Sequence, residues 1–247
     1  MKLLITGAWS PTVSTHAAYL LDRRRRLIKS IEFYSNFDYI EEIYYLDATA
    51  GSEELSRIRC IAPHKILTPP IKYAPKGHHE GPSYLEGLLY IAARNFIAAH
   101  VDAHDMLFKI TGGYVVKNIT KIADQITTKK LSGVGFVQHH PLRIKHKYLM
   151  TSCMALSGEK WSSYINYVQR RINELRVIPL EGVYKDFMMM SGAQKGLSLP
   201  YPRLEARFGT AGGTTDELRY KMYQKLWAIY AKLGLFALTI GNSNGPI

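Results

Sequence analysis

The sequence is poor in several features that assign a protein to a class at once. Its 247 residues include only two cysteines, Cys60 and Cys153, and no Cys-x-x-Cys pair. This disfavours a disulfide framework and a structural zinc site, and a reducing, cytoplasmic setting is expected. No apolar run reaches the roughly 18 residues that a membrane-spanning helix needs. The short run at the N-terminus predicts a first strand rather than a signal peptide.

Acidic residues are few, 20 against 32 lysines and arginines, which gives a formal net charge of +12. This excess favours anionic partners: nucleic acid, acidic lipid headgroups or phosphorylated small molecules. The densest basic run, Arg23-Arg24-Arg25-Arg26, fits either a solvated helix face or an anion contact.

Motifs of common α/β families are missing as well. The chain has no Gly-x-x-x-x-Gly-Lys-Ser/Thr loop, no Gly-x-Ser-x-Gly elbow and no dinucleotide fingerprint. It also has no nucleic-acid-binding motif, and its basic residues are spread along the chain. Both features argue against nucleic-acid binding, but the charge of +12 leaves a basic nucleic-acid- or nucleotide-binding α/β protein without transferase activity open as an alternative function.

Strand and helix patterns alternate along the chain. Apolar runs predict strands over residues 2–8, 39–47, 60–61, 105–110, 132–138 and 149–156. Helical spacing predicts helices over residues 17–35, 82–100, 118–128, 159–175, 183–190 and 214–238. This order predicts one α/β domain over residues 1–247, with a mostly parallel central sheet flanked by helices and a C-terminal helix. Ligands of such sheets bind beyond the carboxyl ends of the strands, here near residues 6–9, 47–52 and 111–114.

Five segments, in order, resemble bacterial GT-A-type glycosyltransferases that build surface polysaccharides such as capsule, O-antigen and lipopolysaccharide. The most specific is Phe108-Lys109-Ile110-Thr111-Gly112-Gly113-Tyr114, with Asn118 beyond it, which resembles a Lys-Ile-Thr-Gly-Arg-Tyr signature. The other four are the arginine-rich segment 23–26 running to Asp47, residues 76–81 ahead of a helix with Glu86, residues 180–184, and residues 208–214. The resemblance covers residues 2–225.

The resemblance implies a Rossmann-like GT-A domain with a nucleotide-sugar-binding half (1–120), an acceptor and catalytic half (121–213) and a C-terminal helix (214–240). It implies glycosyl transfer from a nucleotide-sugar donor to a glycan or lipid-linked acceptor. The catalytic candidates are Glu181 and Lys109. The donor-binding candidates are Thr6, Gly7, Asp47, Lys76, Gly77, His78, Glu86, Thr111, Gly112, Tyr114 and Asn118.

The chain lacks the Asp-x-Asp motif with which many such enzymes hold Mn²⁺ or Mg²⁺. Lys109 stands near its expected place and could neutralise a leaving diphosphate, so no cofactor is expected and a divalent cation is not favoured. A salt-bridged strand end is the other interpretation of Lys109. Gly113 stands where the signature has an arginine able to pair bidentately with a diphosphate, and Lys109 and Lys117 are candidate substitutes.

Other candidates also have two interpretations. Asp47 contacts the nucleoside or caps a helix. Glu181 is a general base or a first-turn acid stabilised by the helix dipole. His78 and His79 precede a helix N-terminus that suits an anion. His100 and His104, spaced i, i+4, lack a third ligand, so no metal site is predicted.

Lysines and aromatics alternate from Arg219 to Lys232 in the C-terminal helix. This pattern fits an interfacial helix, or a helix packed on the core through Leu226, Ile229 and Leu233 with its lysines in solvent. We expect a cytoplasmic protein, peripheral on the inner face of the membrane, with an anionic membrane surface as a partner and no nucleic acid. The sequence leaves open the sugar, the nucleotide, the acceptor and the stereochemistry.

Overall fold

The computed structural model describes residues 1–9, 17–69, 71, 81–137, 149–195, 199–205, 222, 225–226, 229 and 237–241. The helices are α1 (Ala17–Ser35), α2 (Ser52–Arg59), α3 (Pro82–His100), α4 (Ile119–Thr128), α5 (Gly158–Arg170), the 3-10 helix η1 (Ile172–Arg176) and α6 (Leu180–Met190). The strands are β1 (Lys2–Thr6), β2 (Glu42–Leu46), β3 (Ile66–Leu67), β4 (Met106–Thr111), β5 (Val115–Val116), β6 (Leu131–Val137), β7 (Leu149–Ser157), β8 (Gln194–Lys195), β9 (Leu204–Glu205) and β10 (Ala237–Gly241).

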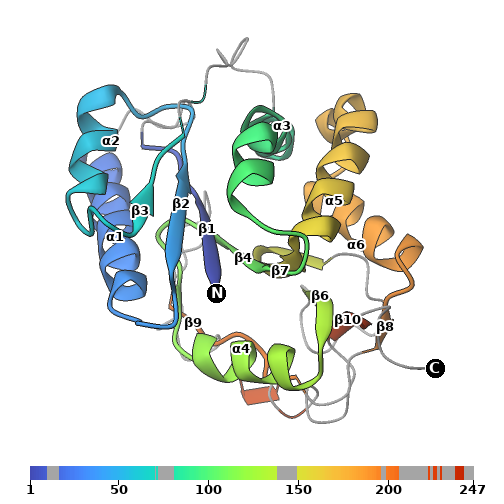
Figure 1. Ribbon diagram of the computed structural model, residues 1–247. Coiled ribbons are helices and arrows are strands. Elements are labelled where there is room, and N and C mark those ends of the chain that lie inside the picture. The colour runs from blue at the N-terminus through green and yellow to red at the C-terminus, as the bar shows by residue number, and fades with distance from the viewer. Residues whose placement is uncertain are drawn as a thin grey trace.

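An eight-stranded sheet, in the order β3-β2-β1-β4-β7-β6-β10-β8, forms the centre of the fold. Strands β3, β2, β1 and β4 pair in parallel, whereas every pair from β4 to β8 is antiparallel. Only β7 and β10 therefore run against the other six strands. Figure 1 shows α1 and α2 on one side of strands β1–β3 and α3, next to α5, on the other. The predicted α/β class, with a mostly parallel central sheet flanked by helices, is confirmed.

Helix α3 covers one face of the parallel strands because its sequence is apolar along one side. Pro82 occupies its first turn, where a missing N–H is harmless. Tyr90, Ala93 and Ile97 are buried on its inner side. Tyr90 packs edge-on against Trp161 of α5, with ring centroids 5.6 Å apart. These contacts hold α3 and α5 together beside the sheet.

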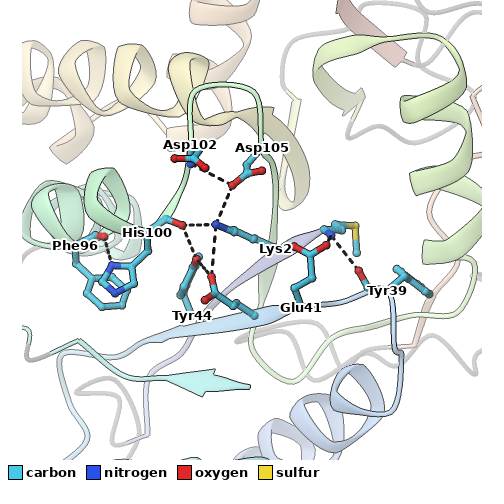
Figure 2. Close-up of polar contacts among 10 residues, drawn as sticks. Lys2, Tyr39, Glu41, Tyr44, Phe96, His100, Asp102 and Asp105 are labelled. Atoms are coloured by element: carbon cyan, nitrogen blue, oxygen red, sulfur yellow. Dashed lines mark hydrogen bonds and ion pairs between the residues drawn. The ribbon is translucent and has the colours of Figure 1, made fainter. Parts of the chain in front are cut away.

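A polar network around Lys2 lies at the amino ends of the parallel strands (Figure 2). The ammonium of Lys2 lies 2.8 Å from a carboxylate oxygen of Asp105, which follows α3, and donates to the carbonyl oxygen of His100. Tyr44 of β2 donates to the same carbonyl oxygen at 3.1 Å. This network ties the start of β1 to the end of α3, at the edge opposite the predicted ligand edge.

Two predictions of secondary structure were wrong. The strand expected near residues 60–61 is the turn that ends α2, where the N–H of Cys60 donates to the carbonyl oxygen of Ser56 at 3.0 Å. Acids in the first turn of α2 and arginines in its last turn favour a helix there. The next strand is β3, at Ile66–Leu67.

The predicted C-terminal helix (214–240) is shorter than expected. Residues 237–240 belong to β10, which pairs with β6 and β8. This pairing joins segments far apart in the sequence, so it could not be seen in the local pattern. Met222, Lys225, Leu226 and Ile229 are helical, and the remaining residues of 214–236 lie outside the described part of the chain. Ile229 is 56% exposed, so the interpretation that it packs on the core was wrong. None of the described helices is long and apolar enough to cross a bilayer.

Candidate functional site

Three parallel strands end side by side at one edge of the sheet. Thr6, the last residue of β1, is the register partner of both Leu46 in β2 and Thr111 in β4. The next residues continue the contact: Gly7 N donates to the Leu46 carbonyl oxygen at 2.8 Å, and Gly112 N donates to that of Thr6 at 2.7 Å. This is the carboxyl edge at which the sequence predicted ligand binding, and it brings four of the candidate residues together.

The glycines at this edge let neighbouring groups approach closely. A Cβ on Gly7 would clash with the hydroxyl oxygen of Tyr45, and one on Gly112 would lie 2.7 Å from a methyl carbon of Leu27 in α1. Gly113 has a φ of +84°, a conformation that strains any residue with a side chain. Position 113 therefore favours glycine here, which explains why the arginine of the signature is absent.

Lys109 lies in the middle of β4 and its side chain is completely buried. Its ammonium nitrogen lies 2.5 Å from Oε1 of Glu86, donates to the carbonyl oxygen of Thr151 at 2.6 Å, and donates to Oγ1 of Thr111 at 3.0 Å. Three partners match the three donors of a lysine. The ammonium is thus neutralised and enclosed by the protein, as in the salt-bridge interpretation of this residue.

Glu86 projects from the second turn of α3 towards the strand ends. Its Oε1 also accepts from Thr6 at 3.2 Å and from Tyr90 at 2.8 Å. The side chain is 24% exposed to solvent. Glu86 therefore joins α3, β1 and β4, and it is the carboxylate of the Lys109 ion pair that reaches the surface.

Glu181 lies in the first turn of α6 and is half-buried. It accepts from Oγ1 of Thr151 at 3.3 Å. The backbone N–H of Leu180 donates to Oγ of Ser83 at 3.1 Å, which fixes the start of α6 against the start of α3. A continuous polar chain therefore runs from Glu86 through Lys109 and Thr151 to Glu181. Sequence reasoning missed Thr151, because a threonine in an apolar strand carries no motif signal.

Two buried tyrosines lie beneath the two carboxylates. Burial raises the pKa of Tyr90 and of Tyr164 well above the usual value, and the negative charges of Glu86 and Glu181 raise both further. The hydroxyl of Tyr164 is buried with no partner among the described residues. Both phenols therefore stay protonated and add no charge next to the two carboxylates.

Asp47 is buried and fully engaged within the protein. Oδ1 accepts from the backbone N–H and the hydroxyl of Thr49, both at 2.7 Å, and Oδ2 accepts from the backbone N–H of Trp9 at 2.7 Å and from the hydroxyl of Tyr45. The residue before α2 is Gly51, so the helix-cap interpretation was wrong. Asp47 instead holds the turns after β1 and β2 against each other.

Tyr114 and Asn118, from the end of the signature, have different surroundings. The hydroxyl of Tyr114 is part-buried, and burial raises its pKa while Arg23 and Arg26 oppose the rise. The Asn118 side chain donates to the carbonyl oxygen of Tyr201 at 2.9 Å and accepts from the backbone N–H of Arg203 at 2.7 Å. Asn118 therefore anchors the chain at 201–203, and its contacts explain its burial without a ligand.

The remaining candidates lie elsewhere. Lys76, Gly77 and His78 fall outside the described residues. His100 ends α3 and His104 follows it, so the two do not share a helix face. His100 stacks on Phe96 near the amino ends of the strands. Across the described residues no group of three or more His, Cys, Asp or Glu side chains could hold a metal ion.

No protein-family model matches the sequence, and no curated protein matches it significantly. Among solved structures, the chain is similar to the glycosyltransferase GlyE of Streptococcus pneumoniae (apo form), with a TM-score of 0.48, 12% identity and coverage of 98% of this chain and 65% of that one. It is similar to mouse xyloside xylosyltransferase 1 (apo form), with a TM-score of 0.45, 10% identity and coverage of 78% and 82%. It is similar to the galactosyltransferase LgtC in complex with donor and acceptor sugar analogs, with a TM-score of 0.42, 10% identity and coverage of 75% and 69%. At these identities and scores the likeness concerns the arrangement of the fold alone.

Proposed function

We propose that the protein is a glycosyltransferase that moves a sugar from a nucleotide-sugar donor to a glycan or lipid-linked acceptor in cell-surface polysaccharide synthesis. The observation that carries the proposal is the polar chain from Glu86 to Glu181 at the carboxyl edge of three parallel strands. This edge is where open α/β sheets bind their ligands. The sequence resemblance to GT-A enzymes supports the same reaction. In this proposal residues 1–120 bind the donor and residues 121–213 bind the acceptor.

Glu181 acts as the general base in this scheme. It is half-buried, and its one described partner is the Thr151 hydroxyl, so a carboxylate oxygen is available for an acceptor hydroxyl. In an inverting transfer, the acceptor oxygen bonds to the anomeric carbon as the bond to the diphosphate breaks. The hydroxyl proton passes to Glu181.

Lys109 has a positioning role, because its ammonium is enclosed. By holding Glu86 and the carbonyl of Thr151, it fixes the two carboxylates relative to the strand ends. Glu86, Thr6 and the turn at Thr111-Gly112 then line the donor site. We propose that transfer needs no divalent cation, and activity that persists in EDTA is the test. Loss in EDTA with recovery in Mn²⁺ or Mg²⁺ refutes this.

The proposed function is tested with a panel of nucleotide sugars. A donor that binds the folded state raises the melting temperature in proportion to the logarithm of its concentration. Release of nucleoside diphosphate is then measured with glycan and lipid-linked acceptors. The proposal fails if no nucleotide sugar shifts the melting temperature and none is consumed. Oligonucleotide binding with a steep salt dependence would instead favour the nucleic-acid alternative.

We further propose that the protein is cytoplasmic and peripheral on the inner face of the membrane. Met222 and Ile229 are 57% and 56% exposed, and Lys225 between them is exposed too. Their spacing places them on one helix face. A face with apolar and basic side chains suits an anionic membrane surface, where a lipid-linked acceptor is found.

A further inference from the structure

The proposed transfer needs positive charge beside the departing diphosphate, and this inference rests on that proposed function. The two lysines expected to supply the charge are engaged elsewhere. Lys109 is enclosed and paired with Glu86. Lys117 lies 2.8 Å from Glu205, which a second lysine, Lys29, also contacts at 3.0 Å. The cation must therefore come from another part of the carboxyl edge.

Helix α1 brings its basic run to this edge. The helix starts at the side where β1 ends, so residues 23–26, in its second and third turns, lie near the turn after β1. Arg23 Nε donates to the carbonyl oxygen of Ala8 at 2.9 Å. It is also near enough to Tyr45 of β2 and to Tyr114 after β4 for its positive charge to oppose the burial-raised pKa of both hydroxyls. Arg23 is therefore anchored at the turn after β1, at the carboxyl edge of the sheet.

The four arginines of this run are not equivalent. Arg24 lies 5.0 Å from the ring centroid of Trp9 and donates to its carbonyl oxygen. Arg26 pairs with Asp22 at 3.1 Å. Arg25 is exposed. Arg23 and Arg24 are both partly buried and both donate through Nε to carbonyl oxygens of the turn after β1. The guanidinium of Arg24 lies over the Trp9 ring, whereas the two terminal nitrogens of Arg23 form no hydrogen bond or ion pair with a described residue.

We propose that Arg23 binds the diphosphate of the nucleotide-sugar donor through its two terminal guanidinium nitrogens. A guanidinium presents parallel N–H groups that match two oxygens of a phosphate. The hydrogen bond from Nε to the Ala8 carbonyl oxygen fixes the orientation of the guanidinium before the ligand binds. Less side-chain entropy is therefore lost on binding. The positive charge of the guanidinium can also stabilise the leaving diphosphate after the sugar has moved.

The test is calorimetric titration of the full chain with UDP, GDP, CDP and ADP, followed by the same titration of variants. For the diphosphate that binds, Arg23→Ala is expected to weaken affinity about 10- to 100-fold, the range of hydrogen bonds to a charged group. Affinity for the corresponding nucleoside stays unchanged, because Arg23 contacts only phosphate. Arg23→Lys keeps the charge without the two parallel donors and falls in between. Arg25→Ala, which alters an exposed arginine of the same basic run, is the matched control and binds like the wild type.

The melting temperature without ligand shows whether each variant is folded. If Arg23→Ala is unstable, Arg23→Gln replaces it, because its amide can still donate to Ala8. Equal diphosphate affinity of wild type and Arg23 variants overturns the assignment of Arg23 and leaves the transferase proposal standing. Equal weakening of nucleoside and diphosphate overturns it too, since that result indicates a structural role. Failure of the wild type to bind any nucleoside diphosphate rejects both proposals.

Discussion

The ammonium nitrogen of Lys109 lies 2.5 Å from Oε1 of Glu86, and the two side chains differ sharply in exposure, at 0% and 24%. The lysine belongs to the sheet interior, whereas the glutamate reaches the site. The pair as a whole adds no net charge where a diphosphate would bind. The lysine of the signature, in the middle of β4, thus fixes an acid and a backbone carbonyl.

The first prediction concerns the stability of this pair. Glu86→Gln leaves a fully buried ammonium without its carboxylate and should lower the free energy of unfolding by about 3–5 kcal/mol. Lys109→Met leaves a carboxylate that still reaches water and should lower it by less, about 1–3 kcal/mol. The double variant should be more stable than the sum of both losses implies. Urea unfolding measures all three, and strictly additive losses would show that the two side chains are not coupled.

The second prediction concerns Glu181 as the base. Glu181→Gln should reduce kcat about 10²- to 10⁴-fold, the usual contribution of a positioned base. Donor affinity should change little, because Glu181 lies on the acceptor side of the polar chain. Glu159→Gln, an exposed acid in the first turn of α5, is the control. Near-normal turnover of Glu181→Gln would assign the base elsewhere, with Glu86 the next candidate.

The third prediction concerns acid stability at the opposite edge. The hydrogen bond from Lys2 holds the pKa of Asp105 below its ordinary value of 3.8. A lowered pKa stabilises the fold above the unfolded-state value, and this stabilisation is lost as the pH falls through the folded-state value. Asp105→Asn should therefore lower stability at neutral pH by at most about 1 kcal/mol, because the carboxylate is partly exposed.

The difference between Asp105→Asn and the wild type should shrink as the pH falls below about 4 and vanish below the folded-state pKa of Asp105. Melting temperatures recorded from pH 7 to pH 3 follow it, with Asp102→Asn as a control on the same loop. A difference that is constant over this range would mean that the carboxylate charge of Asp105 does not contribute.

The fourth prediction separates the two cysteines. Burial raises the pKa of Cys153 to about 12, and its side chain is 1% exposed, whereas Cys60 is exposed. Because the thiolate is the reactive form, only Cys60 should react with a maleimide in the folded protein. Mass spectrometry should find one label per native chain and two in urea. In Cys60→Ser the native protein should stay unlabelled, and labelling of Cys153 there would indicate that β7 opens readily.

The fifth prediction tests membrane association. The full chain should float with vesicles containing anionic phosphatidylglycerol at low salt and remain unbound with neutral phosphatidylcholine. Each basic residue near such a surface contributes about 1 kcal/mol. Ile229→Asp should reduce flotation, whereas Val177→Asp, which alters a residue 86% exposed elsewhere, should not. Absence of flotation at low salt would exclude the membrane proposal.

Features encoded by neighbouring residues could be predicted from the sequence. The bounds of α1 and α3 agree with the prediction to the residue, because helical spacing and Pro82 are local signals. The short strands β8 and β9 and the terminal β10 were missed, since their pairing depends on strands distant in the chain. Glu86 and Glu181 could be named as candidates from the sequence, and their roles remain predictions. The partner of Lys109 could not be predicted, because it comes from a helix 23 positions earlier.

The close packing of α1 against the turn after β4 has a consequence for related sequences. A Cβ on Gly113 would lie 3.6 Å from the Cβ of Arg26, an ordinary van der Waals contact, so a side chain at 113 would start directly beside the basic run of α1. We expect the two positions to covary. Relatives with an arginine at 113 should carry smaller or uncharged residues in the basic run of α1, and relatives with glycine there should keep the helix arginine. Related sequences would then supply the positive charge at the carboxyl edge from either of two segments, position 113 or helix α1.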